Sequence, residues 1–187
     1  YKGTANAIYQ NIDFVDRFSP DYVVILSGDH IYKMDYAALV AYHEKHKASC
    51  TIAVRNVPLA EASRFGILNT NPDNTIYEFE EKPAKPKSTN ASMGIYCFNW
   101  QVLRDALIAD EENPSSANDF GKNIIPSLLA DGHKMMAYPF DGYWKDVGTI
   151  DSRWEANMDL LGKEPAFQLR GDKRSTIYAR NSAMPSS

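Results

Sequence analysis

The sequence has little cysteine, no long apolar run and no cluster of basic residues. Its two cysteines, Cys50 and Cys97, lack the C-x-x-C spacing of zinc and redox sites, so both are expected to be buried and reduced, as in a cytoplasmic protein. No apolar run approaches the ~20 residues of a membrane-spanning helix, and residues 1–4 do not resemble a signal peptide. Neither a membrane protein nor an exported, disulfide-linked protein is therefore expected.

Charge and histidine content argue against three further classes. The net charge is −4, from 20 basic and 24 acidic residues, and no basic segment alternates with aromatic residues as in nucleic-acid binders. The four histidines are scattered, and His43 and His46 do not form an H-E-x-x-H zinc motif, so surface histidines are expected. The G-x-S-x-G motif that carries the nucleophilic serine of many hydrolases is absent. Nucleic-acid binding, zinc catalysis and serine hydrolysis are thus disfavoured.

The remaining pattern is that of an α/β domain. With 187 residues, 44% of them hydrophobic, the chain can bury one sizeable core. Helical and strand periods alternate, and a turn at residues 71–74 joins two strands as a hairpin, so the sheet is expected to be mixed. Helices are expected over about residues 5–18, from Asp35 into the forties, and over 100–110, 119–130 and 150–161; strands are expected over 23–30, 50–57, 65–70, 75–81, 93–98 and 135–140.

The apolar run from residue 23 to residue 26 leads into Ser27, Gly28 and Asp29. It predicts a strand buried on both faces whose carboxyl end delivers an acid into a crevice, the place where open α/β sheets bind ligands. A strand-end aspartate is also a common helix cap or turn residue. Asp29 is therefore a functional candidate that needs support from elsewhere in the chain.

A second candidate acid is Asp146, which lies in a short aromatic segment between Gly142 and Gly148. Such an acid can be a plain N-terminal cap of the helix that follows. However, magnesium is typically bound by one or two carboxylates, keeps several waters and takes its other ligands from phosphates. Asp29 and Asp146 together would form such a pair.

Lys82 ends a predicted strand and is followed by Pro83, which fixes the strand exit and could aim the ammonium at an anion. The alternative is a solvated surface charge. Glu81 could accept hydrogen bonds from sugar hydroxyls or be an ordinary surface acid. Gly66 and Ser92 would normally mark only strand entry. The tryptophans at 100, 144 and 154 are expected in the core, although the one at 144 could also stack on a sugar.

Six ordered segments resemble the glucose-1-phosphate adenylyltransferase family, the bacterial ADP-glucose pyrophosphorylases of glycogen synthesis. The segments are residues 3–5, 26–36, 81–83, 91–96, 119–122 and 143–149. The resemblance implies a Rossmann-like nucleotidyltransferase fold with a mixed, mostly parallel sheet flanked by helices, incomplete at its amino-terminal end. Residues 1–162 would be part of the catalytic domain, and residues 163–187 a linker toward a missing left-handed β-helix domain.

The resemblance also implies roles for individual residues. Asp29 and Asp146 would be the catalytic, magnesium-binding acids, and Lys82 would contact the sugar phosphate. The glucose 1-phosphate site would be lined by Tyr1, Gly66, Glu81, Lys82, Ser92, Asp119, Phe120 and Trp144, and the nucleotide would lie against Gly3 and Thr4. Three positions depart from the family pattern, namely Asn6, Asn118 and Asn123.

The implied reaction transfers AMP from ATP to glucose 1-phosphate and releases pyrophosphate. Its nucleophile is already anionic, so no general base is needed. The family's glycine-rich triphosphate loop is not formed by any of the ten glycines, so we expect activity from the full-length, cytoplasmic homotetramer and none from this chain alone. Two alternatives remain: a non-catalytic regulatory paralogue that binds sugar phosphate, and a metal-dependent glycosyltransferase, although no D-x-D motif occurs.

Overall fold

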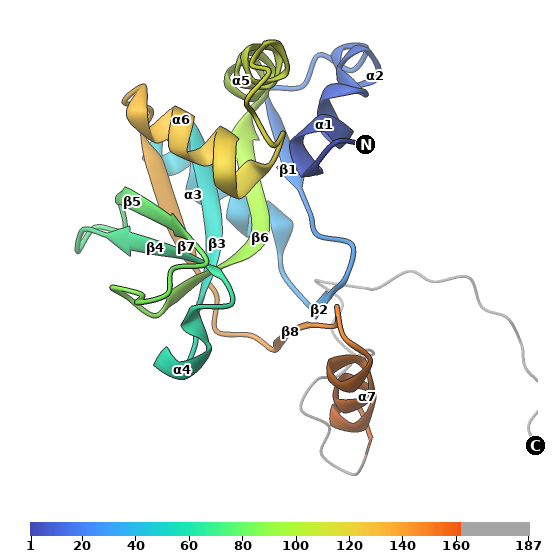
Figure 1. Cartoon of the computed structure of the whole chain (residues 1–187). Coiled ribbons are helices and arrows are strands. Elements are labelled where there is room, and N and C mark those ends of the chain that lie inside the picture. The colour runs from blue at the N-terminus through green and yellow to red at the C-terminus, as the bar shows by residue number, and fades with distance from the viewer. Residues whose placement is uncertain (162–187) are drawn as a thin grey trace, which may run out of the picture. The chain divides into compact units, whose positions relative to one another are not determined.

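A computed structural model describes residues 1–161, which fall into two compact units. Unit 1 contains Tyr1–Ser27 and Tyr36–Asp141, and unit 2 contains Gly28–Asp35 together with the described residues from Gly142 onward (Figure 1). The predicted linker at residues 163–187 lies outside the described residues, so that boundary stays a prediction. No helix of the described part is long and apolar enough to cross a membrane.

Unit 1 follows the predicted order of helices and strands, with one short additional helix at Leu59–Ala62 that was not predicted. Its helices are α1 (Thr4–Tyr9), α2 (Ile12–Asp16), α3 (Tyr36–His46), α4 (Leu59–Ala62), α5 (Trp100–Glu112), the π-helix η1 (Phe120–Ile124) and α6 (Ile125–Ala130). Its strands are β1 (Tyr22–Ile25), β3 (Cys50–Asn56), β4 (Gly66–Thr70), β5 (Ile76–Glu81), β6 (Asn90–Asn99) and β7 (Met135–Pro139). The smaller unit 2 holds β2 (His30–Tyr32), β8 (Trp144–Asp146) and α7 (Ile150–Asp159).

The sheet of unit 1 is mixed, as predicted, but its pairing is not mostly parallel. The strand order is β5-β4-β6-β3-β7, and β1 also pairs with β6. Because β6 runs antiparallel to β1, β3 and β4, the pair β3 and β7 is the one parallel pair among the described strands. Strands β1, β3, β4 and β7 therefore point the same way, with β6 reversed among them. The reversed strand β6 lies between β4 and β3 and also pairs with β1, so every pair that it forms is antiparallel.

Strand β6 changes partners along one edge. Its carboxyl half, Tyr96 to Asn99, pairs with β1, whereas Ala91 near its start pairs with β4. Gly94 lies between these halves with a φ of 65°, a conformation that glycine adopts without strain, and the register against β3 shifts at the same level. The bend at Gly94 thus lets one strand serve two neighbours.

The core of unit 1 lies between the sheet and the helices α5 and α6, with α3 on the opposite face (Figure 1). Alternation along β3 explains this division, because Cys50 and Ile52 point into the α5–α6 core while Thr51 points toward α3. Cys50 and Cys97 are buried and free, as predicted, and burial raises the pKa of the Cys97 thiol to about 11. Trp100 is buried as predicted, but Trp154 is 63% exposed and does not belong to a core.

Two predicted elements differ from the structure. The strand that precedes Asp29 ends at Ile25 and is half-buried along its length, because among the described strands β1 pairs only with β6 and lies at an edge. Asp29 therefore lies beyond a short loop, next to β2, rather than at the carboxyl end of β1. The first predicted helix is divided into α1 and α2 at residues 10–11.

The prediction of surface histidines is wrong for His43, which is fully buried in α3. Its Nδ1 lies 2.8 Å from Thr51 Oγ1, and its Nε2 lies 2.8 Å from Asn99 Oδ1. These partners explain why a polar ring is tolerated inside the protein. Burial lowers the pKa of His43 below its ordinary value, and the bond to Asn99 offsets part of this effect.

This buried imidazole predicts a pH-dependent stability. Because the folded-state pKa of His43 lies below the ordinary value of 6.5, the unfolded chain binds the proton more tightly. The stabilisation is therefore fully present when the pH is above the ordinary pKa of histidine. It is lost as the pH falls through the lower pKa that His43 has in the folded state. Urea midpoints measured from pH 7.5 down to pH 5 should fall more steeply in the wild type than in His43→Gln. His46→Gln is the control and should follow the wild-type profile.

Candidate active site

Unit 2 brings the two predicted metal acids together. Strands β2 and β8 pair antiparallel with His30 opposite Asp146, and the backbone N–H of Val147 donates to the carbonyl of Asp29 at 2.9 Å. Asp29 and Asp146 thus leave neighbouring strands at the same end of this small sheet. Although they are far apart in sequence, the β2–β8 ladder brings them together.

Both carboxylates lie over the same glycine. A β-carbon added at Gly148 would lie 3.1 Å from Asp146 Oδ1 and 3.7 Å from Asp29 Oδ2. The N–H of Gly148 donates to Asp146 Oδ1 at 2.8 Å, which orients that carboxylate. The absence of a side chain at Gly148 therefore leaves a space that two carboxylate oxygens border.

This donor set fits magnesium. The ion prefers oxygen ligands and binds through one or two carboxylates together with substrate phosphates. Among residues 1–161 no group of three or more histidine, cysteine, aspartate or glutamate side chains could hold a metal by itself. The side chain of Asp29 is 62% exposed, so solvent and a ligand can reach it. Asp29 and Asp146 are the residues of the described part that would hold the ion.

His30 is a neighbour of this site that the sequence did not reveal as functional. Its Nε2 lies 3.7 Å from Asp29 Oδ1, and its Nδ1 accepts a hydrogen bond of 3.3 Å from the indole N–H of Trp144. The two rings meet edge to face with centroids 5.4 Å apart. Trp144 is half-buried, and its predicted contact with sugar stays a prediction. The signal for His30 was its position directly after Asp29.

A cluster of ion pairs links helix α7 to β8. Lys145 Nζ lies 3.0 Å from Asp159 Oδ2 and 3.1 Å from Glu155 Oε2, and the Tyr143 hydroxyl donates to Asp159 at 2.8 Å. Burial, together with Asp159, raises the pKa of Tyr143 to about 12. At the start of α7, the side chain of Thr149 caps the helix. These contacts fix the backbone on the carboxyl side of Asp146.

In unit 1, the carboxylate of Glu81 lies between two glycines. Gly66 is the cross-strand partner of Glu81, and a β-carbon there would lie 3.1 Å from Glu81 Oε2. A β-carbon at Gly121, on η1, would lie only 2.5 Å from the same oxygen. Burial raises the pKa of Glu81 above its ordinary range, while Lys82 opposes the shift. Glu81 is therefore a half-buried carboxyl group between two glycines rather than a surface acid.

Lys82 leaves β5 in a strained conformation. Its φ is 47°, in the left-handed region that residues with a β-carbon rarely occupy. Its N–H donates to the carbonyl of Phe65 at 3.2 Å, which holds this turn, and its side chain is 66% exposed. The ammonium lies 3.8 Å from Glu81 Oε1. Strain of this kind is kept at functional sites when the surroundings enforce it.

Asp119 ties the start of α1 to the π-helix. Its Oδ1 accepts hydrogen bonds of 3.0 Å from the N–H groups of Gly121 and Lys122, and its Oδ2 accepts one of 3.1 Å from the Thr4 hydroxyl. The Phe120 N–H in turn donates to Thr4 Oγ1 at 3.1 Å. Thr4 and Asp119, predicted for nucleotide and sugar phosphate respectively, are thus joined directly in the structure.

The other predicted site residues of unit 1 differ widely in exposure. The ring of Phe120 is buried and stacks on Tyr96 at 5.5 Å, so it packs in the core. Ser92 is buried on β6, where its Oγ accepts a hydrogen bond of 3.3 Å from Gly94 N–H. Tyr1 is exposed and borders a cavity of about 620 Å³ beside α1. A side chain at Gly3 would collide with the carbonyl oxygens of the segment before Asp119.

Two asparagines that depart from the family pattern share one acidic neighbour. Asn6 Nδ2 donates to Glu111 Oε2 at 2.9 Å, and Asn118 Nδ2 donates to Asp110 Oδ2 at 3.0 Å and to Glu111 Oε2 at 3.3 Å. Glu111 already pairs with Lys2 Nζ at 2.6 Å, and an aspartate at position 6 would bring a second carboxylate to that one ammonium. The amide side chain therefore matches the glutamate that it faces. Asn123, the third departure, instead accepts a hydrogen bond of 3.2 Å through its side-chain oxygen from the Asp119 N–H.

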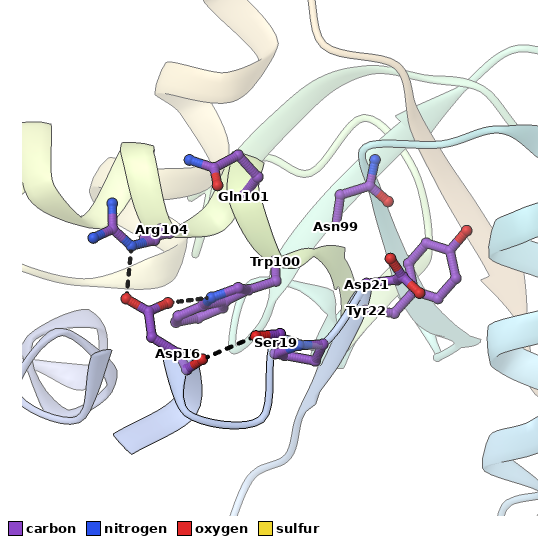
Figure 2. Close-up of a pocket in the computed structure, with 9 residues that line it drawn as sticks. Asp16, Ser19, Asp21, Tyr22, Asn99, Trp100, Gln101 and Arg104 are labelled. Carbon is purple, nitrogen blue, oxygen red and sulfur yellow. Dashed lines mark hydrogen bonds and ion pairs between the residues drawn. The ribbon is translucent and has the colours of Figure 1, made fainter. Parts of the chain in front are cut away.

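A separate cavity of about 650 Å³ opens between the α2–β1 connection and the start of α5 (Figure 2). The carboxylate of Asp16 borders it, accepting 2.7 Å and 3.0 Å hydrogen bonds from Trp100 Nε1 and Arg104 Nε. These bonds lower the pKa of Asp16. None of the residues predicted to bind metal, sugar phosphate or nucleotide lines this cavity.

Comparison with known proteins identifies the family. Residues 1–163 match the nucleotidyl transferase family model. The chain belongs to this family. Relatives named glucose-1-phosphate adenylyltransferase include those of Clostridium perfringens (strain SM101 / Type A), 64% identical over 185 residues, Clostridium beijerinckii, 61% identical, and Acetivibrio thermocellus, 57% identical. Each alignment covers 99% of the chain but only 47%, 48% and 43% of the respective relative.

The chain thus spans about half the length of the curated relatives that it matches. The predicted nucleotidyltransferase fold class, an α/β arrangement with a mixed sheet flanked by helices, is confirmed. The roles of the individual site residues stay predictions, which the geometry above makes testable.

Proposed function

We propose that this nucleotidyl transferase chain is part of a glucose-1-phosphate adenylyltransferase, which transfers AMP from ATP to glucose 1-phosphate and releases pyrophosphate. The observation that carries the proposal is the convergence of Asp29 and Asp146 over Gly148, because a phosphate-bound magnesium ion needs such a pair of carboxylates. The names of relatives at 57–64% identity support the choice of substrates.

The reaction needs charge neutralisation and positioning more than acid–base catalysis. A phosphate oxygen of glucose 1-phosphate attacks the α-phosphorus of ATP in line, and this oxygen is already anionic near neutral pH. Lys82 supplies a positive charge to the sugar phosphate, and Glu81 accepts hydrogen bonds from sugar hydroxyls. Magnesium, held by Asp29 and Asp146 when bound, neutralises phosphate charge. Fixed in-line geometry can contribute roughly 7–11 kcal/mol to such a reaction.

The wider setting is proposed from the family resemblance. The full-length protein would act in glycogen synthesis as a cytoplasmic homotetramer, with ATP and glucose 1-phosphate as substrates and no nucleic-acid or membrane partner. The low net charge of −4 and the absence of a basic segment support the last point.

The deciding experiment is an assay of pyrophosphate release from ATP and glucose 1-phosphate. It uses the protein extended to the length of its relatives, and the 187-residue chain alone is expected to be inactive. Release that requires both substrates and magnesium would support the proposal. Sugar-phosphate binding without turnover would instead indicate a regulatory paralogue, and sugar transfer without pyrophosphate release would indicate a glycosyltransferase.

Lys82→Ala is expected to raise the KM for glucose 1-phosphate about 10- to 100-fold and to leave the KM for ATP nearly unchanged. A hydrogen bond to a charged group contributes roughly 1.5–3 kcal/mol, and each 1.4 kcal/mol is about tenfold in affinity. Lys87→Ala removes a nearby lysine that pairs with Glu78 at 2.6 Å, and it is the matched control. Equal losses for both substrates would contradict the assignment of Lys82.

A further inference from the structure

We infer that His30 is a positioning residue for Asp29: with its proton on Nε2, a state that Trp144 selects, it turns the Asp29 carboxylate toward the cation site. The inference rests on the proposed role of Asp29 and Asp146 in binding magnesium. All of its contacts lie within unit 2. His30 itself would touch neither the ion nor the substrates.

The first step concerns the tautomer of His30. An indole N–H can only donate a hydrogen bond, so His30 Nδ1, which lies 3.3 Å from Trp144 Nε1, must be the acceptor. A neutral imidazole whose Nδ1 accepts carries its proton on Nε2. Trp144 therefore selects the Nε2–H form.

The second step concerns the direction of that proton. Nε2 is the nitrogen that faces Asp29, at 3.7 Å from Oδ1. This separation is longer than a hydrogen bond, so the N–H dipole acts on the carboxylate through space. The opposite tautomer would present a lone pair to the carboxylate and repel it.

The third step concerns the neighbours of the two carboxylate oxygens of Asp29. Oδ1 is the oxygen near His30, whereas Oδ2 is the one near Gly148, on the side of Asp146. An attraction that holds Oδ1 therefore turns Oδ2 toward the space that both carboxylates border. Rotation of the Asp29 carboxylate would move Oδ1 away from His30 and Oδ2 away from Gly148 at the same time.

The fourth step is that His30 is held more firmly than Asp29. The side chain of His30 is only 12% exposed and that of Asp29 is 62% exposed. Trp144 packs edge to face against the imidazole, and the backbone of His30 is paired with Asp146 in the β2–β8 ladder. A well-packed ring beside an exposed carboxylate reduces the ordering that ligand binding requires.

The test uses the 187-residue chain without nucleotide and has two readouts. Long-range ¹H–¹⁵N spectra of ¹⁵N-histidine-labelled chain report the tautomer, and the His30 signals are assigned by their loss in His30→Phe. Binding of Mn²⁺, a magnesium substitute, is followed by its electron paramagnetic resonance signal. Loss of a residue that orients a metal ligand typically weakens binding about 10- to 100-fold, so we expect at least a tenfold loss in His30→Phe.

Matched variants separate positioning from folding. In His30→Gln the side-chain amide can place an N–H near the position of Nε2, so Mn²⁺ affinity should stay within about threefold of the wild type. His133→Phe, in unit 1, is the control histidine and should bind Mn²⁺ normally. Trp144→Phe should keep the ring contact but allow the second tautomer to appear.

The results separate the inference from the proposed function. Mn²⁺ binding that Asp29→Asn does not weaken, or no binding by the wild type, overturns the cation site and with it the role of His30. Binding that depends on Asp29 but is equal in His30→Phe and the wild type overturns the inference alone. A proton on Nδ1 of His30, or a His30→Gln variant as weak as His30→Phe, also overturns it.

Discussion

Asp146→Asn is expected to lower kcat/KM for pyrophosphate release by about 10²- to 10³-fold in the protein at the length of its relatives. Asparagine keeps an oxygen that can accept the hydrogen bond from Gly148, so the turn after β8 should be preserved. What is lost is a negative charge at the proposed ion site. A metal that stabilises transition-state charge contributes several kcal/mol, and each 1.36 kcal/mol is about tenfold in rate.

The matched control for this substitution is Asp151→Asn. Asp151 is exposed in the first turn of α7, in the same unit, so the change in net charge is the same. Its activity should remain within about twofold of the wild type, because exposed charges contribute little. Activity lost equally in both variants, or retained in Asp146→Asn, would show that Asp146 does not act through an ion. Asp29→Asn should resemble Asp146→Asn, and the double variant should be little worse than either alone.

Phe98→Ala is expected to lower the free energy of unfolding by about 3–5 kcal/mol, the usual range for a buried phenylalanine. Phe98 is fully buried on β6, with its ring centroid 5.9 Å from that of Tyr96 and 6.0 Å from that of Phe120. It is also the register partner of both Val23 and Cys50, so the cavity would lie where three strands meet. Domains of this size are commonly stable by only ~5–15 kcal/mol.

Equilibrium unfolding in urea measures this effect, with Tyr77→Ala as the comparison. Tyr77 is an aromatic residue on β5 whose side chain is largely exposed, and its loss should change stability by no more than about 0.5 kcal/mol. A Phe98→Ala variant as stable as Tyr77→Ala would mean that the β6 core can close over the missing ring.

Most helices and strands could be predicted because their signals are local. The turn at residues 71–74 marked the β4–β5 hairpin, and Asn74 indeed adopts a φ of 67° there. The pairing of β6 could not be read in this way, since strand neighbours depend on contacts between distant residues. The helix predicted over residues 119–130 begins as the π-helix η1, where the Asp119 carboxylate accepts the N–H groups of Gly121 and Lys122. The hydrophobic period predicted a helix here but did not distinguish its π-helical turn.

The candidate site shows the same limit. Gly28 before Asp29, and Gly142 and Gly148 on either side of Asp146, indicated acids in special backbone settings. The structure joins these acids through the β2–β8 pair. No local pattern connected Trp144 to His30, because the residues are far apart in sequence. The same is true of Gly121 and Glu81, whose contact depends on the position of η1 beside β5. Exposure of Trp154 was missed because the size of a side chain does not reveal which face of a helix is covered.

The position of β6 also affects the order in which the chain can fold during synthesis. Ile25 on β1 pairs with Tyr96, and Cys50 on β3 pairs with Phe98, so neither earlier strand can meet this partner until the ribosome has passed that region. Contacts between such distant residues slow folding, and unpaired apolar strands are prone to aggregate while they wait. A nascent chain arrested before residue 90 should therefore depend on chaperones far more than one released after β7, when the residues that complete the core of unit 1 have also been made.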